Sequence, residues 1–413
     1  MIEGHGDDLY RYSNITANFS SNVYNEVEHA SLWEHLKGRM ECMVSYPEPQ
    51  PYTLEGAIAE SCGVAGENVC VTNGATEAIY LIAQCFAGGT SVIFVPTFSE
   101  YADGCRVHGH NIVECTDLER IKDRCRTDAP VLVWICNPNN PTGKVMEKGE
   151  LQKLVEEFPQ VTFVFDQSYA FFTEQEVMSV KEGVAYKNVI QLHSMTKRYA
   201  VPGVRLGYLT ACAELLQRIR EIRMPWSVNA FAIETGLFLL QNDISKSTDI
   251  NVLLAKSRAL GEKIASFGAG TPEGCFFEVE PSHTHYMLVR IARPLDYGNF
   301  RSVSAAVLKE YLAQECGILI RNASNFATLG EGHFRIATQN DAQNEGEFLF
   351  CLAECNDHAG ANEGQADGNK EVGGAFRTYT NRCVERVENA ANGPCHCGKV
   401  NGTGHLVHQF TGS

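Results

Sequence analysis

Long apolar runs are absent from this sequence of 413 residues, and none approaches the roughly 18 apolar residues of a membrane-spanning helix. The opening residues, MIEGHGDDLYRY, also lack the basic and apolar regions of a secretory signal. Basic residues are scarce, with 34 Lys and Arg against 50 Asp and Glu, which gives a formal net charge of -16. This balance argues against a surface for nucleic acid or for an anionic membrane. We therefore expect a cytoplasmic protein that binds neither.

The 16 cysteines could indicate a secreted scaffold held by disulfides. Many of them stand inside apolar runs such as VLVWICN at 131–137, where buried thiols of a reducing compartment are expected. The sequence contains no internal repeats. Its hydrophobic fraction of 44% is ordinary for a globular chain, and the length suffices for two domains.

Short apolar runs alternate with helical patterns between about residues 69 and 211. Buried strands are predicted where β-branched, continuously apolar runs are bounded by turn residues, at 90–98, 131–136, 161–166, 188–194 and 204–211. Between two of these runs, Leu151, Leu154 and Phe158 fall at helical spacing. Buried strands separated by helices predict an α/β fold with a mostly parallel sheet.

The pattern changes after a helical region at 211–265. Strand patterns at 284–291, 318–322 and 333–339 then flank a helical segment, which predicts a smaller α+β domain. We therefore divide the chain into an N-terminal arm with part of the small domain, a large domain, a small domain and a flexible Gly- and Asn-rich tail, at 1–45, 46–265, 266–355 and 356–413.

One lysine stands at an unusual place, directly after an apolar run in LHSMTKRYAVPGVRLGY at 192–208. Lys197 could be a surface residue that buries only its apolar stem. Alternatively, burial could keep its amine partly unprotonated and ready to form a Schiff base with a carbonyl compound. Ser194, Thr196 and Arg205 are close in sequence, and hydroxyl and guanidinium groups together suit a phosphate. A lysine of this kind beside a phosphate site indicates pyridoxal phosphate.

The pyridine nitrogen of that cofactor requires a carboxylate. Asp166 ends the apolar run VTFVFD, at the edge of a sheet where α/β proteins place their sites. The alternative is that Asp166 only caps the next helix. Tyr169 and Asn137, the latter in ICNPNNPTG, are candidates to hydrogen-bond the phenolic oxygen of the ring. Taken alone, that Asn-Pro segment would be no more than a turn.

A second wall for the phosphate is predicted in VTNGATEAIYLIAQCF at 71–86. Gly74, Ala75 and Thr76 form a turn before a helical pattern, and the free amides at a helix N-terminus bind anions. Tyr101, in VPTFSEY, follows the next strand pattern at a place where an aromatic ring could cover the cofactor.

In this order and spacing, TNGATEAI, PTFSEY, CNPNNPTG, FDQSY and SMTKRYAVPGVRLGY resemble the motifs of fold-type I pyridoxal-phosphate enzymes, the aspartate aminotransferase superfamily. The resemblance covers about residues 5–355, and it implies an α/β fold with an aspartate-aminotransferase-like large domain of mostly parallel sheet plus a smaller α+β domain. Within the superfamily it is strongest to the branch that holds histidinol-phosphate aminotransferase and threonine-phosphate decarboxylase. It implies a homodimer in which Tyr46, in YPEPQPYTLEGAIAE, reaches the cofactor phosphate of the second subunit.

Both kinds of enzyme in that branch handle phosphorylated substrates. Arg321 and Arg335 could bind a substrate carboxylate or phosphate, although two surface arginines are the alternative. The segment EGHGDDLYRYSNITANFSSN resembles the start of threonine-phosphate decarboxylase, which implies that His5 and Asn22 bind substrate; the alternative for His5 is a surface residue. We therefore expect decarboxylation of L-threonine O-3-phosphate to (R)-1-aminopropan-2-yl phosphate, a step toward the cobalamin side chain. The alternatives are histidinol-phosphate-type transamination with 2-oxoglutarate and a non-catalytic relative that binds the cofactor.

Two segments depart from these relatives. The run VYNEVEHAS follows the FSSN motif where a Pro-Gly-containing run is usual, and His283 and His285 stand in a strand pattern that is usually less polar. Either departure could alter the substrate.

The tail concentrates thiols and imidazoles, which can bind zinc or iron, at Cys383, Cys395, Cys397, His405 and His408. The Cys-His-Cys spacing is not that of an ordinary structural site, which uses two cysteines separated by about two to four residues. We therefore predict no metal.

Overall fold

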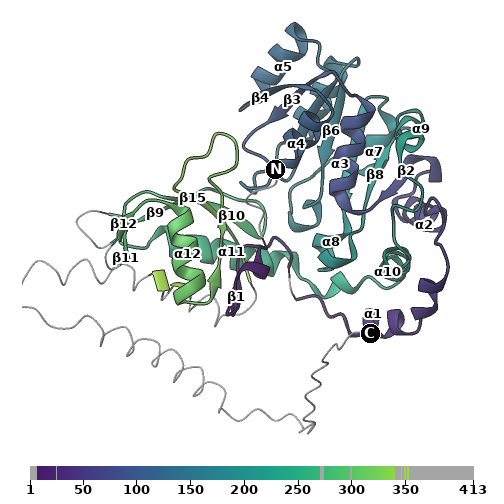
Figure 1. Cartoon of the computed structure of the whole chain (residues 1–413). Helices are drawn as coiled ribbons and strands as arrows, with labels where there is room; N and C mark the ends of the chain where they lie inside the picture. Colours follow the sequence, from purple (N-terminus) through teal and green to yellow (C-terminus); the bar gives the residue numbers. More distant parts are fainter. Residues whose placement is uncertain are drawn as a thin grey trace, which may run out of the picture. The chain divides into compact units, whose positions relative to one another are not determined.

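The computed structural model describes residues 7–24, 26–269, 274–297 and 300–339, together with positions 346, 348–349 and 351–352. Most of the described strands lie in two sheets, one of seven strands between residues 69 and 211 and one of four strands between residues 277 and 337 (Figure 1). No helix in these described ranges is long and apolar enough to cross a membrane. The five cysteines and histidines singled out in the tail lie outside the described residues.

The seven-stranded sheet has the strand order β2-β8-β7-β6-β5-β3-β4. Strands β4, β3, β5, β6 and β7 run parallel, whereas β8 is antiparallel to both of its neighbours. Parallel strands covered on both faces must be almost continuously apolar, and every residue of β5 and β6 is buried. The strands are β2 (Val69–Thr72), β3 (Thr90–Phe94), β4 (Asn111–Cys115), β5 (Leu132–Cys136), β6 (Thr162–Asp166), β7 (Val189–Ser194) and β8 (Gly207–Ala211).

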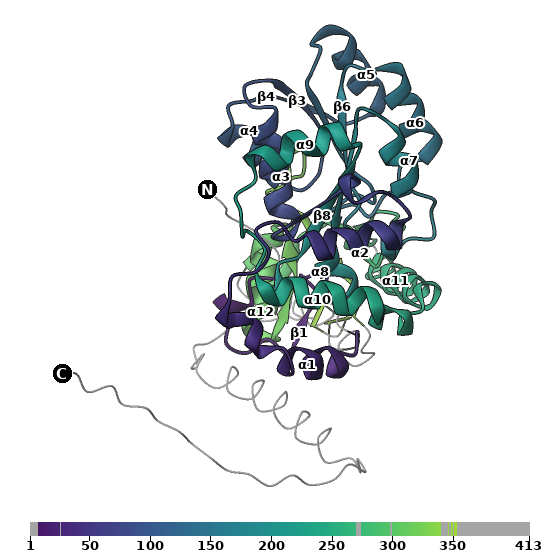
Figure 2. The same ribbon diagram turned by 90° about the vertical axis from the view of Figure 1, so that its right-hand side faces the viewer.

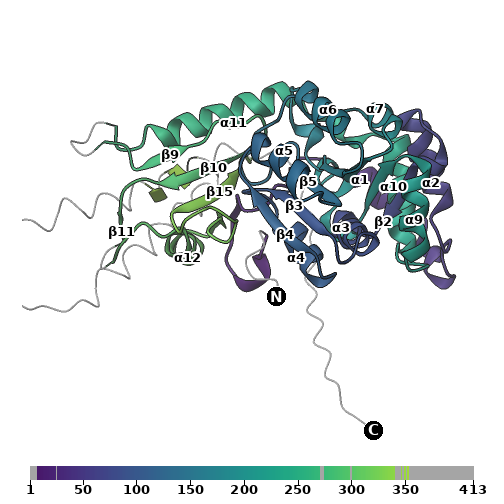
Figure 3. The same ribbon diagram turned by 90° about the horizontal axis from the view of Figure 1, so that it is seen from above.

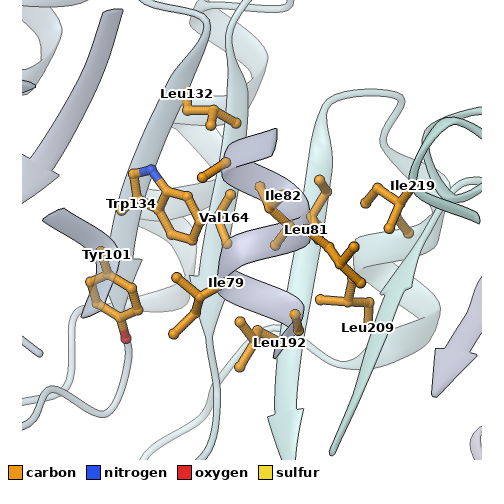
Figure 4. Close-up of a cluster of buried hydrophobic side chains, with 14 of the residues drawn as sticks. Ile79, Leu81, Ile82, Tyr101, Leu132, Trp134, Val164, Leu192, Leu209 and Ile219 are labelled. Carbon is orange, nitrogen blue, oxygen red and sulfur yellow. The ribbon is translucent and has the colours of Figure 1, made fainter. Parts of the chain in front are cut away.

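Helices cover both faces of this sheet. On one face lie α3 (Gly74–Cys85), α4 (Glu100–Val107) and α9 (Ala213–Ile222), and Ile79 and Ile82 of α3 pack with Trp134 and Leu209 of the sheet (Figure 4). On the other face lie α5 (Leu118–Thr127) and α6 (Lys148–Glu157). The shorter α7 (Val180–Ala185) contacts β7 and β8. Each fully buried aliphatic or aromatic side chain contributes about 1.5–3 kcal/mol to the stability of this core.

Three further helices pack together with residues of β2. They are α1 (Ala30–Lys37), α2 (Tyr52–Cys62) and α10 (Ala230–Gln241), and α10 contacts both of the others (Figure 2). The short helical turn η2 (Met40–Val44) connects α1 to α2 and also contacts α10. The N-terminal part of the chain is thereby held against a helix that lies far later in the sequence.

The four-stranded sheet is antiparallel, with the order β14-β15-β10-β9. Its strands are β9 (Phe277–Val279), β10 (Tyr286–Ile291), β14 (Arg321–Asn322) and β15 (His333–Ala337). Helices α11 (Ile250–Ala265) and α12 (Ala305–Glu315) share its core, and α11 runs lengthwise beside β9 and β10 (Figure 3). Two small pairs complete the described strands, β1 (Ala17–Asn18) with β13 (Ile318–Leu319) and β11 (Leu295–Tyr297) with β12 (Phe300–Ser302).

This architecture confirms the predicted α/β class, a mostly parallel sheet accompanied by a smaller α+β region. One predicted strand, at 204–211, begins later than expected, because Arg205 has a positive φ of 61° and η5 (Pro202–Val204) precedes it. The division of the chain near residues 45, 265 and 355 stays a prediction. The pairing of β1 with β13 agrees with placing part of the N-terminal arm in the small domain.

Candidate active site

The carboxyl ends of β5, β6 and β7 meet at one edge of the seven-stranded sheet. In the sheet register Cys136 lies opposite Asp166, and Ser194 lies opposite Gly207. A cavity of about 200 Å³ opens at this edge, the place where open α/β sheets bind ligands. Its lining consists of Asp7, Ser20, Ser21, Asn22, Val23, Ala75, Thr76, Ile79, Phe98, Tyr101, Cys136, Asn140, Asp166, Ser168, Tyr169, Ser194, Thr196, Lys197, Pro202, Arg205 and Arg335.

Lys197 lies in this cavity because the short helix α8 (Met195–Arg198) follows β7 without an intervening loop. The pKa of the Lys197 amine is lowered to about 8, chiefly by burial and also by the nearby charges of Arg335 and Arg205, whereas Asp7 and Asp166 oppose the shift. Near neutral pH an appreciable fraction of the amine is therefore unprotonated, which is the form that attacks a carbonyl carbon.

Asp166 is a buried carboxylate with two hydrogen-bond donors. The Ser168 N–H donates to Oδ1 at 2.8 Å, and the Tyr101 hydroxyl donates to Oδ2 at 2.6 Å. Burial raises the pKa of Asp166, whereas both donors and the charge of Lys197 lower it. The Tyr101 ring also stacks on Trp134, with ring centroids 5.3 Å apart (Figure 4). The end of β6 thus presents a carboxylate that is held in one orientation.

An anion cradle is formed where α3 begins. Gly74 has a positive φ of 76°, and a Cβ atom there would lie 2.6 Å from Nη2 of Arg205. Only glycine therefore lets the guanidinium approach the first turn of the helix. Ala75 and Thr76 follow in that turn and line the cavity, where the amides of a helix N-terminus favour negative charge.

The other part of the cradle comes from the end of β7, from α8 and from the residues that lead into β8. The hydroxyls of Ser194 and Thr196 lie 2.8 Å apart and line the cavity with Arg205. A Cβ atom on Gly207 would lie 2.6 Å from the Ala75 nitrogen, so this glycine lets β8 pass directly beside the start of α3. A guanidinium, two hydroxyls and the helix amides therefore converge on one place, and this donor set fits a phosphate group.

Arg335 reaches the cavity from β15 of the other sheet. Its Nη1 donates to Asn140 Oδ1 at 2.5 Å and its Nη2 to the Ser20 carbonyl at 2.6 Å, whereas its Nε has no hydrogen-bond partner among the described residues. In the sheet register Arg335 lies directly opposite Arg321, and both side chains are buried. Burial lowers the pKa of both guanidinium groups, that of Arg321 to about 9. Arg321 does not line the cavity, and its Nη2 donates to Asn325 at 2.8 Å.

Asn22 also lines the cavity with polar atoms that are not satisfied. Neither atom of its buried carboxamide meets hydrogen-bond geometry with any described residue, although Asn22 is close enough to Tyr169 to lower the pKa of that phenol. The lowering is smaller than the effect of burial, which raises the pKa of Tyr169 to about 12. The main-chain carbonyl oxygen of Asn22 lies 3.1 Å from Nε2 of the buried His285.

The structure brings together most of the residues singled out in the sequence, but not all of them. Asn137 does not line the cavity, because its carboxamide is bonded to the main chain of Met146, accepting at 2.8 Å and donating at 3.2 Å. Asn140, three residues later in the same motif, lines the cavity instead. Tyr46 is 86% exposed and does not line the cavity, and His5 lies outside the described residues.

Several residues at or beside the cavity were not singled out in the sequence, among them Asn140, Gly207 and Asp7. Asn140 and Gly207 stand inside the motifs CNPNNPTG and VRLGY, so the signal was present but pointed to neighbouring positions. Asp7 stands in a segment without periodicity, and no sequence pattern marks it. Among the residues that the structure describes, no group of three or more His, Cys, Asp or Glu is placed to hold a metal ion.

A lysine of lowered pKa, a buried carboxylate and an anion cradle at the carboxyl edge of a parallel sheet define an enzyme site for a phosphorylated cofactor that bears a carbonyl group. The chain belongs to the family of class I and II aminotransferases, whose model matches residues 15–346. Enzymes of this family depend on pyridoxal phosphate, and the residues of the cavity fit that cofactor.

Similar curated proteins include both kinds of enzyme in the branch named above. Threonine-phosphate decarboxylase of Salmonella typhimurium is 27% identical over 337 residues, 79% of this chain and 88% of that protein. Histidinol-phosphate aminotransferase of Caldanaerobacter subterraneus is 25% identical over 309 residues, 73% of this chain and 81% of that protein. The adenosylcobalamin biosynthesis bifunctional protein CobDQ of Leptospira interrogans is 27% identical over 75% of this chain, which spans only 35% of that longer protein.

Solved structures agree with the family. L-Threonine-O-3-phosphate decarboxylase from Porphyromonas gingivalis superimposes with a TM-score of 0.75 at 34% identity, covering 82% of this chain and 98% of the other. Histidinol-phosphate aminotransferase from Sinorhizobium meliloti, solved in complex with pyridoxal-5'-phosphate, superimposes with a TM-score of 0.71 at 19% identity, covering 83% and 90% of the two chains. The second likeness shows the fold alone.

Proposed function

We propose that this enzyme decarboxylates L-threonine O-3-phosphate to (R)-1-aminopropan-2-yl phosphate, a step of cobalamin side-chain synthesis. The observation that carries the proposal is the pair of buried arginines, Arg321 and Arg335, directly opposite each other on β14 and β15. Two like charges at opposed positions of a sheet destabilise it unless anions accompany them. A substrate with both a carboxylate and a phosphate supplies such anions. The relatives named threonine-phosphate decarboxylase, one of them 34% identical, support the same reading.

The cavity residues divide into a part for the cofactor and a part for the substrate. When bound, pyridoxal phosphate supplies a ring that accepts the electrons of a bond broken at the carbon next to the substrate nitrogen. Asp166 would keep the ring nitrogen protonated, and Tyr101 would cover the ring. Tyr169 and Asn140 would donate hydrogen bonds to the phenolic oxygen. The residues that would hold the phosphate are Gly74, Ala75, Thr76, Ser194, Thr196 and Arg205.

The substrate part decides which bond breaks. Arg335 and Asn22 would bind the substrate carboxylate and orient the bond between it and Cα for cleavage, which would release carbon dioxide. The Lys197 amine would then return a proton to Cα, a role that its lowered pKa favours. His5 would bind the substrate phosphate. Arg321 does not line the cavity and would act on that phosphate through its neighbour Arg335.

Transamination of the histidinol-phosphate type with 2-oxoglutarate is the second candidate, and the 25% identical aminotransferase that aligns over 81% of its length favours it. In that reaction the bond between Cα and hydrogen would break instead, and Lys197 would move the proton. The test supplies purified enzyme with O-phosphothreonine and measures carbon dioxide, and in parallel supplies histidinol phosphate with 2-oxoglutarate and measures glutamate. Carbon dioxide without glutamate supports decarboxylation, whereas glutamate without carbon dioxide refutes it.

We also propose that the enzyme works as a homodimer. Large apolar side chains are exposed on α1, η2, the segment that follows it and the residues before α10, namely Trp33, Met40, Met43, Val44, Tyr46, Met224 and Trp226. Tyr46 and Trp226 contact each other, with ring centroids 5.5 Å apart. Grouped apolar exposure of this kind marks a protein interface. A second copy of the chain would cover this surface and bring Tyr46 to the cofactor phosphate of its neighbour.

The proposed dimer can be tested by substituting two exposed valines, one inside the apolar group and one outside it. Val44 is 85% exposed in the apolar group, and Val107, on α4, is 68% exposed outside it. A charge at an interface is desolvated on assembly, so Val44→Asp should shift the mass measured by sedimentation from dimer to monomer. Val107→Asp is the matched control and should leave the dimer unchanged. A wild-type protein that sediments as a monomer contradicts the proposal.

A further inference from the structure

The first described residues form an arm that is fixed to the small sheet region. The buried carboxylate of Asp8 forms an ion pair with Lys309 of α12, and the Tyr12 hydroxyl donates to Glu310 at 2.7 Å. Between these anchors lies the helical turn η1 (Leu9–Arg11). Because both anchors join the same helix, the residue that precedes Asp8 has a defined place.

That residue, Asp7, lines the cavity. It has a positive φ of 65°, and two hydrogen bonds hold it: its N–H donates to Ser20 Oγ at 3.0 Å, and its Oδ1 accepts from Asn18 at 2.7 Å. A non-glycine residue in this region of φ is held there by its surroundings. Ser20 also accepts from Arg335 through its carbonyl oxygen, so one residue holds both Asp7 and Arg335.

The charges around the cavity are few. The charged residues that line it are Asp7, Asp166, Lys197, Arg205 and Arg335. If Asp166 faces the ring nitrogen and Arg205 the cofactor phosphate, Arg335 and Asp7 are left to face the substrate, one cation and one anion. Asp7 makes no ion pair with any residue that the structure describes.

We infer that Asp7 is a specificity-determining residue that receives the ammonium group of the incoming substrate. This inference rests on the proposed function only in requiring a substrate with an amine next to an anionic group. The carboxylate attracts the ammonium toward Lys197 while Arg335 takes the anion, so the two charges orient the substrate before any bond changes. The same carboxylate repels ligands that carry anions but no amine.

The test compares O-phosphothreonine with its amine-free counterpart, 3-phosphonooxybutanoate, on the cofactor-loaded enzyme. The variant Asp7→Asn keeps an acceptor for Asn18 and leaves the main-chain bond to Ser20 intact. We expect KM for O-phosphothreonine to rise about three- to five-fold with little change in kcat, which is the range of an exposed charge contact. The inhibition constant of the amine-free ligand should fall by a similar factor.

Two further variants separate specificity from structure. Asp7→Glu keeps the charge and should restore the preference for the amine. Glu315→Gln removes one exposed charge from the end of α12, away from the cavity, and should change the binding of neither ligand. If Asp7→Asn weakens the binding of both ligands together, or changes the binding of neither, the inference is wrong although the wild type binds its substrate. If the wild type binds neither O-phosphothreonine nor histidinol phosphate, the proposed function is wrong and the inference fails with it.

Discussion

The Tyr101 hydroxyl donates a hydrogen bond of 2.6 Å to Oδ2 of Asp166, and this contact connects the start of α4 with the end of β6. The same tyrosine stacks on Trp134, so ring packing fixes the donor. A buried carboxylate without a donor would take up a proton, because burial raises its pKa. Tyr101 therefore helps to keep Asp166 ionised, in addition to the proposed role of its ring over the cofactor.

Removal of this donor should destabilise the protein. In Tyr101→Phe the carboxylate loses a charge-assisted hydrogen bond, which is worth about 1–3 kcal/mol when one partner is removed from a buried pair. The pKa of Asp166 should rise, because the bond from Tyr101 lowers it. The free energy of unfolding of the cofactor-free protein can be measured with urea. Tyr80→Phe is the matched control, since Tyr80 donates to Glu100 at 3.0 Å outside the cavity, and an equal loss in both variants would contradict the special role of the Asp166 contact.

A methyl group on Gly207 should disrupt the anion cradle. An added Cβ would lie 2.6 Å from the Ala75 nitrogen and 2.9 Å from the His193 carbonyl, and both are main-chain atoms that cannot turn away. Gly207→Ala should cost about 1–3 kcal/mol of stability and weaken the binding of pyridoxal phosphate, as measured by equilibrium dialysis. Gly203→Ala, four residues earlier, is the control, because an added Cβ there meets nothing within 4 Å. Equal cofactor binding by both variants would show that the close passage of β8 is unimportant.

The reactivity of Lys197 should titrate near pH 8. Only the unprotonated amine attacks a carbonyl carbon, so the rate at which the cofactor-free protein takes up pyridoxal phosphate should rise with pH through about 8 and then level off. A lysine at its ordinary pKa of 10.5 would still be gaining rate above pH 9. Because the charge of Arg335 lowers the pKa of Lys197, Arg335→Gln should move the titration to higher pH. Stopped-flow absorbance measures this rate, and a shift of the titration to lower pH would contradict the electrostatic coupling.

His285 should make the protein sensitive to acid. Burial lowers the pKa of this imidazole to about 3, against 6.5 for a free histidine. Between those two values the unfolded chain binds a proton that the folded chain does not, so stability falls as pH decreases from 6.5 toward 3. His285→Gln cannot be protonated and should reduce that slope by up to about 1.4 kcal/mol per pH unit. Urea unfolding at several pH values measures the slope, and an unchanged slope would mean that His285 is charged in the folded state.

Sequence patterns were informative where a functional residue is tied to the end of a strand. Asp166 is the last residue of β6 and Lys197 stands three residues after the end of β7, and the apolar runs of both strands predict buried strands. The sequence pointed to Asn137 and not to Asn140, because the direction in which each side chain of one turn points is not encoded in the motif. The main chain of Met146 takes up the carboxamide of Asn137 and leaves Asn140 for the cavity.

Contacts between distant parts of the chain were also beyond the sequence. Arg335 donates to the Ser20 carbonyl across 315 positions, and Asp8, next to Asp7 of the cavity, is held by Lys309 across 301 positions. The opposition of Arg321 and Arg335 depends on the register of two strands. A sequence shows that arginines are present, but register and the anchoring of an arm are set by packing that acts over the whole domain.

We propose that Lys197 anchors pyridoxal phosphate in the cavity beside Asp166 and Arg205. To test this, the protein is loaded with pyridoxal phosphate, the attachment is made permanent with borohydride, and the digested chain is mapped by mass spectrometry. We expect the pyridoxyl group on the peptide that contains Lys197 and none on the variant Lys197→Ala. Attachment at a different lysine, or none at all in the wild type, would contradict this proposal.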